Sequence, residues 1–130
     1  MVSRAGPGEM SIAATFIGAA RLVALLDRDE PDHTFAGHML QIELDARVAL
    51  VTSNYEVVKA ALELQRRHGI DGPRQLLEGF VPFLHVEWCT RHDHATAVAA
   101  HLAADAGAGA GDLVDAVSAQ IMRRTGARPM

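Results

Sequence analysis

Three short apolar runs divide this chain into alternating strand-like and helix-like segments. The runs lie at 13–17, 48–51 and 80–88, and each is followed by two segments with helical character. Short strands that are apolar on both faces are typical of a parallel sheet, because helices cover such a sheet on both sides. We therefore predict an α/β fold with three layers (α/β/α), a parallel central sheet and the element order βααβααβαα.

The expected helices have recognisable start and stop signals. Thr52-Ser53-Asn54 offers several capping side chains immediately before one helix, and Gly69 follows the basic last turn of that same helix. Pro31 favours a loop that separates two earlier helices. The predicted helices span 20–27, about 31–47 with Pro31 in the first turn, 55–68, 74–79, 90–106 and 112–124.

The size and composition of the chain are those of one small folded domain. It has 130 residues, 49% of them hydrophobic, and a net charge of −4, which excludes a broad basic field for nucleic acid but leaves room for a small RNA-facing cleft. We expect a loose N-terminal leader over 1–12, a folded domain over 13–124 and a short C-terminal tail over 125–130. Met1 and Met10 are both candidate start residues.

Cysteine content and hydropathy indicate the compartment. Cys89 is the single cysteine, so an intramolecular disulfide is excluded, and a buried structural thiol is favoured over a nucleophile. The sequence contains no apolar stretch that matches a signal peptide or the ~20 residues of a membrane helix. We therefore expect a cytoplasmic protein without a membrane partner.

Three segments carry a more specific pattern, at residues 16–33, 50–60 and 112–122. In order, in spacing and in the lengths of the helices between them, they resemble the PIN-domain family, and in particular the VapC-like toxin ribonucleases of type II toxin–antitoxin systems. The resemblance implies cleavage of RNA with Mg²⁺ or Mn²⁺, hard cations that three or four carboxylates hold. It also implies RNA and an antitoxin-like protein as partners.

Carried over residue by residue, most of the metal-binding pattern of that family is missing. Gly18 stands where the resemblance implies the first acid, Lys59 stands where it implies a Glu, and Ala108 stands where it implies the third acid. Asp115 matches the fourth acid. Asp112 is an added carboxylate one helical turn before it, close enough to share a cation.

Two further acids are candidates to replace the missing ones. Glu56 lies three residues before Lys59 on the same helix, and Asp105 precedes a Gly-Ala tract. Both also have explanations without a metal, Glu56 as a partner of the helix dipole and Asp105 as a solvated residue. Lys59, the only lysine, is interpreted as a cation that fills the vacated metal position and neutralises Asp112 and Asp115. The candidate catalytic residues are therefore Asp115 and Asp112, and Glu56 joins them as a candidate metal ligand.

Charged residues elsewhere have simpler interpretations. His92 and His94 are two residues apart, and side chains at that spacing on a helix point about 200° apart, so they do not converge on one ion. A solvated helix start with Asp93 near its N-terminus is favoured instead. Arg66-Arg67 and Arg123-Arg124 are explained by helix dipoles and solubility, with phosphate contact as the alternative.

Three functional hypotheses follow. The favoured one is a PIN-domain protein with little or no cleavage, a pseudoenzyme that binds RNA or a partner. The alternative is an active Mg²⁺-dependent endoribonuclease toxin that uses Asp112, Asp115 and displaced acids, and a third is a decayed copy without a selected function. Relatives of this type continue into a further strand, so we expect the last edge strand to be missing and a homodimer or partner chain to cover the exposed edge.

Overall fold

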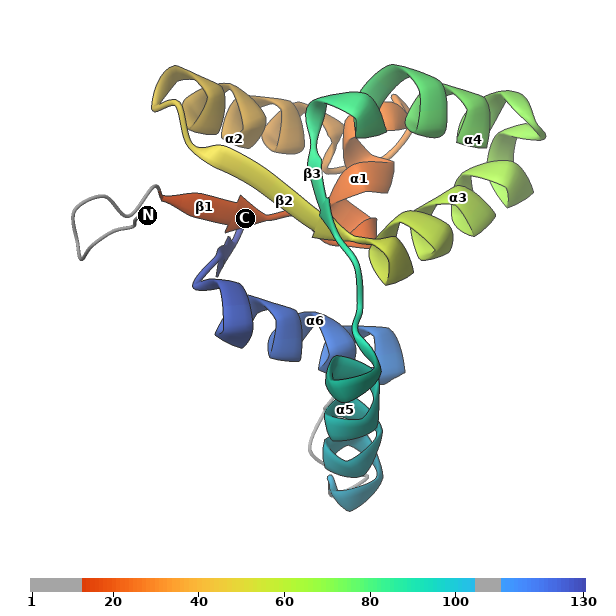
Figure 1. Ribbon diagram of the computed structural model, residues 1–130. Coiled ribbons are helices and arrows are strands. Elements are labelled where there is room, and N and C mark those ends of the chain that lie inside the picture. Colours follow the sequence, from red (N-terminus) through yellow and green to blue (C-terminus); the bar gives the residue numbers. More distant parts are fainter. Residues whose placement is uncertain (1–12, 105–110) are drawn as a thin grey trace.

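The strands form one parallel sheet at the centre of the molecule (Figure 1). This computed structural model describes residues 13–104 and 111–130. In these residues the sheet has four strands in the order β3-β2-β1-β4, and every neighbouring pair is parallel. The strands are β1 (Ala14–Phe16), β2 (Ala49–Ser53), β3 (His85–Glu87) and β4 (Arg128–Pro129).

Helices follow β1, β2 and β3, and another helix precedes β4. They are α1 (Ala19–Leu26), α2 (His33–Asp45), α3 (Asn54–His68), α4 (Asp71–Arg74), α5 (Arg91–Ala103) and α6 (Leu113–Thr125). After α4 the chain continues through a π-helical turn, η2 (Gln75–Phe80), and a 3-10 turn, η3 (Val81–Phe83). The predicted 74–79 helix therefore begins earlier, and the apolar run from Phe80 enters its strand only at His85.

Two apolar clusters hold the layers together, one on each face of the sheet. One face is covered by α1, α3 and the α4–η2 segment, with a core of residues including Ile17, Leu22 and Leu76. The other face is covered by α6, against which α5 packs, with Phe16 and Ile121 in its core. Figure 1 shows these helix layers on opposite sides of the strands. The prediction of a three-layer α/β/α fold with a parallel sheet is confirmed.

The C-terminal edge of the sheet requires a correction. We expected the last edge strand to be missing, whereas Arg128–Pro129 forms the short β4 beside β1. Gly126 ends α6 in the left-handed conformation (φ 79°), which turns the chain back toward the sheet. The Met130 N–H then donates to the Phe16 carbonyl at 3.0 Å. The tail therefore covers part of the edge that we expected to be open.

Some of the expectations from the sequence concern residues that the structure does not describe. The leader over 1–12, Asp105 and Ala108 lie outside the residues that the structure describes. Within the described ranges, no helix is long and apolar enough to cross a membrane.

Candidate functional site

The residues singled out in the sequence meet at the carboxyl ends of β1 and β2, where open parallel sheets place their sites. Gly18 lies two residues after the end of β1, Glu56 and Lys59 lie on the first two turns of α3, and Asp115 lies on the first turn of α6. These four residues line a cavity of about 470 Å³. The fold thus brings together residues that are up to 97 positions apart, from Gly18 to Asp115.

Lys59, which lines this cavity, forms an ion pair with Asp112. The Lys59 Nζ lies 2.6 Å from the Asp112 Oδ2, and both side chains are about half exposed. The hydrogen bond to Asp112 raises the pKa of Lys59, and the charges of Asp115 and Glu56 act in the same direction. In return, the Lys59 ammonium lowers the pKa of Asp112. The cation beside these acids is therefore an ammonium group of the chain itself.

Asp112 and Asp115 also cap α6. The Asp112 Oδ1 accepts a hydrogen bond from the Asp115 N–H at 2.9 Å, and the Asp115 Oδ2 accepts one from the Asp112 N–H at 3.0 Å. This reciprocal capping box satisfies backbone donors that the first turn of a helix leaves without partners. Both carboxylates therefore have a structural role at the start of α6.

Glu56 is buried and joins three helices. Its Oε1 accepts a hydrogen bond from the Ala19 N–H at 2.8 Å, at the start of α1. Its Oε2 accepts a hydrogen bond from the Ser118 hydroxyl on α6. The N–H of Glu56 itself donates to the Ser53 hydroxyl, which caps α3 as the sequence predicted. The sequence did not reveal the contacts with Ala19 and Ser118.

Within the described residues, this donor set offers few free carboxylate oxygens to the divalent cation that the family resemblance implies. Mg²⁺ and Mn²⁺ require several oxygen ligands around one point. Here an ammonium group holds Asp112, and both oxygens of Glu56 already accept hydrogen bonds within the protein. Among the residues that the structure describes, no three His, Cys, Asp or Glu side chains are grouped so that they could hold a metal ion.

The histidine segment gives one confirmation and one correction. Thr90 caps α5 in a second capping box with Asp93, so the predicted helix start is confirmed. Asp93 is not solvated, however, because its side chain is 1% exposed. Two hydrogen bonds from Arg124, at 2.8 and 3.1 Å, hold the pKa of Asp93 at about 2. His94 lies elsewhere, with its Nδ1 2.7 Å from the Tyr55 hydroxyl.

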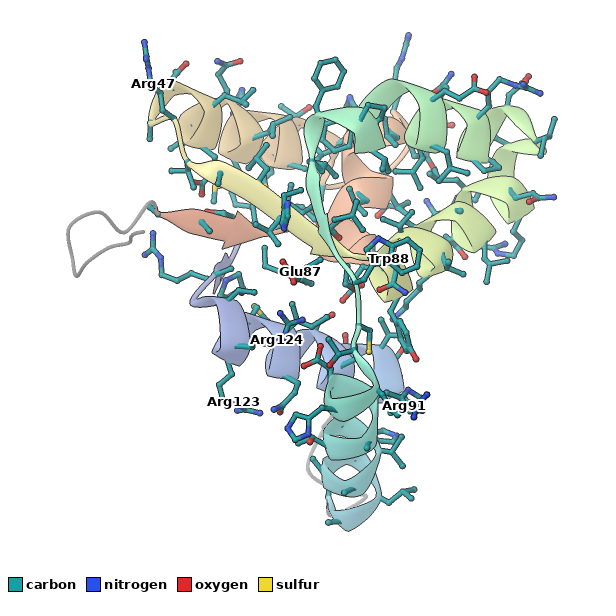
Figure 2. The ribbon with its side chains drawn as sticks, viewed as in Figure 1. Arg47, Glu87, Trp88, Arg91, Arg123 and Arg124 are labelled. Atoms are coloured by element: carbon teal, nitrogen blue, oxygen red, sulfur yellow. The ribbon has the colours of Figure 1, made fainter. Side chains whose placement is uncertain are left out.

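In each of the two arginine pairs, one arginine forms ion pairs with acids on other elements of the fold. Arg124 binds Glu87 at 2.9 Å as well as Asp93, whereas Arg123 points away from this cluster (Figure 2). Arg67 likewise contacts Asp27, Glu30 and Glu63, and these contacts tie the end of α3 to the end of α1 and the loop that follows it. These arginines are therefore structural cross-links, which the sequence pattern did not distinguish from their exposed neighbours.

Comparison with known proteins identifies the fold. No protein-family model and no curated protein matches the sequence. Among solved structures, the chain is similar to VapC20 of Mycobacterium tuberculosis, a toxin that cleaves the sarcin–ricin loop, with a TM-score of 0.74 and 21% identity. The similarity covers 87% of this chain and 84% of that chain. The chain therefore has a VapC-like PIN fold, as its sequence resemblance predicted.

Proposed function

We propose that this chain is a VapC-like PIN-fold protein that does not cleave RNA by divalent-metal catalysis and acts by binding RNA or a partner protein. The observation that carries the proposal is the ion pair of Lys59 with Asp112, close to Asp115 and Glu56. PIN-domain VapC ribonucleases generally use Mg²⁺ or Mn²⁺. An internal ammonium at this place competes with such an ion for the same carboxylates.

The chemistry of an ammonium group supports binding rather than hydrolysis. A divalent cation lowers the pKa of a bound water and stabilises the charge that grows on a phosphate. An ammonium group attracts a phosphate but does not coordinate and activate a water. The contributions of catalytic groups that act as a unit are not additive, so we expect the replacement of several acids to remove most of the RNA-cleavage rate.

An RNA-cleavage assay tests this proposal. We expect no cleavage of a sarcin–ricin loop oligonucleotide or of total RNA in Mg²⁺ or Mn²⁺ above the level in EDTA. RNA affinity, measured by fluorescence anisotropy, is expected to be the same with Mg²⁺ and with EDTA. The matched control is Asp115→Asn, which is expected to leave the cleavage background unchanged. Metal-dependent cleavage that Asp115→Asn abolishes would instead establish the active endoribonuclease.

The proposed partners are RNA and an antitoxin-like protein, both met in the cytoplasm. The VapC-like fold supports both. The cavity beside Lys59 also contains Arg21, Glu30 and Glu63, so it presents both signs of charge to a ligand. Such a mixed lining suits a charged peptide segment as well as a phosphate.

We also propose that the chain forms a homodimer through an apolar α3 face, defined here as Val58 and Leu62 on α3 together with Trp88, which follows β3 and lies beside Val58. These side chains are 57%, 66% and 69% exposed. Val58 and Leu62 line a hollow of about 500 Å³ with Val114, and Val58 and Trp88 line a neighbouring one. Contiguous exposed apolar side chains of this kind commonly mark interaction surfaces.

Sedimentation velocity tests the dimer. We expect the unmodified chain to sediment as a dimer and Leu62→Asp to sediment as a monomer, because a carboxylate cannot be buried there without a partner. Leu102→Asp is the matched control, since Leu102 is 77% exposed on α5, outside the α3 face. A monomeric unmodified chain, or an equal effect of both substitutions, would refute this interface.

A further inference from the structure

Residue 18 is a glycine, so the N-cap position of α1 has no side chain that could cap the helix. Gly18 is the N-cap residue of α1, with an ordinary extended backbone (φ −88°, ψ 174°) and no side-chain capping bond. A Cβ at this position would lie 3.7 Å from the Cδ and from both carboxylate oxygens of Glu56. That distance is ordinary van der Waals contact, so a side chain fits, and its first neighbour is the Glu56 carboxylate.

The Glu56 carboxylate does from α3 what a capping side chain does from the N-cap. It accepts the Ala19 N–H, one of the donors that the first turn of α1 leaves without a helical partner. It also accepts the Ser118 hydroxyl, and its side chain is almost completely buried. A negative charge at this place also interacts favourably with the N-terminal dipole of α1.

We propose that Glu56 supplies from α3 the carboxylate that caps the start of α1, and that acids at positions 18 and 56 therefore exclude each other. Glu56 is then a positioning residue that fixes the starts of α1 and α6 against α3. This inference is independent of the proposed function, because it concerns the arrangement of the helices and not RNA binding or metal.

Like-charge repulsion makes the two positions exclusive. An aspartate at position 18 would place a second carboxylate beside one that is buried, where water screens the repulsion poorly. The Lys59 ammonium offsets this repulsion only in part, because its hydrogen-bonded partner is Asp112 and it also interacts with the charges of Asp115 and Glu56. Asparagine has the same shape as aspartate and caps a helix about as well, but it carries no charge. Comparing Gly18→Asp with Gly18→Asn therefore separates the effect of the charge from that of the side-chain shape.

A double-mutant cycle measured by thermal unfolding tests the proposal. In the unmodified background, we expect Gly18→Asp to lower Tm by about 5 °C, and Gly18→Asn and Gly18→Ala to change it by no more than about 2 °C. In the Glu56→Gln background, we expect Gly18→Asp to leave Tm unchanged or to raise it, because the new carboxylate caps α1 without a charged neighbour.

The sign of the Gly18→Asp effect in the two backgrounds decides the outcome. An equal loss in both backgrounds, or a loss for Gly18→Asn equal to that for Gly18→Asp, would overturn the proposal. Where Gly18→Asp or Glu56→Gln alone fails to fold, recovery of folded protein in the double variant supports it. Failure of the double variant as well refutes it.

Discussion

Arg124→Met is expected to lower the free energy of unfolding by about 3 kcal/mol, near the lower end for breaking a buried ion pair. The reason is Asp93, which is 1% exposed and would lose both hydrogen bonds from the guanidinium. The same substitution removes the contact with Glu87, so α6 loses its polar link to α5 and to β3. Urea denaturation followed by circular dichroism measures the change.

The neighbouring arginine provides the control for this prediction. Arg123 donates to Gln120 on its own helix and is exposed, so we expect Arg123→Met to change stability by less than about 0.5 kcal/mol. Similar losses for the two variants would show that positive charge at the end of α6, rather than the Asp93 contact, is responsible.

The pH dependence of stability gives this prediction a second readout. Arg124 lowers the pKa of Asp93 from 3.8 to about 2 in the folded state. A lowered folded-state pKa contributes stability above pH 3.8 that is lost as the pH falls from about 3.8 to about 2. Arg124→Met is expected to weaken this loss, so the stability of the variant and that of the unmodified chain converge in acid.

Ile121→Ala is the second large change, with an expected loss of about 3 kcal/mol. Ile121 is fully buried in the cluster that fixes α6 to the sheet, together with Phe16, Val51 and Val117. The truncation removes apolar contacts and leaves a cavity that a sheet-bound helix cannot close completely. Urea denaturation at pH 7 measures the loss.

Leu102→Ala on α5 is the matched control, because it removes similar apolar atoms from a side chain that is 77% exposed. We expect it to change stability by less than about 0.5 kcal/mol. Equal effects of the two substitutions would mean that α6 is not anchored by this cluster.

The layers of the fold were predictable because each depends on local pattern. The apolar runs predicted β1 to β3, and the capping side chains at 52–54 marked the start of α3, where Ser53 is the N-cap residue. The short strand β4 was not predictable, because Arg128–Pro129 is a two-residue pairing without an apolar run. Its position depends on the turn at Gly126 and on a strand more than a hundred residues earlier.

The proximity of the candidate site residues was predictable, but their contacts were not. The order of the strands and helices was sufficient to place Lys59, Asp112 and Asp115 at one edge of the sheet. The hydrogen bond between Glu56 and Ser118 spans 62 residues, and that between Asp93 and Arg124 spans 31. Nothing in the local sequence distinguishes such partners from exposed charges, because burial is decided by how the helices pack.

The single lysine makes the candidate site accessible to selective chemistry. Reductive methylation modifies primary amines, and in this chain the only side-chain amine is that of Lys59, which is about half exposed. Labelling with ¹³C would therefore give one side-chain methyl signal beside that of the terminal amine. This signal would report directly on the environment of the acids around Lys59, including the arrival of an RNA phosphate or a metal ion.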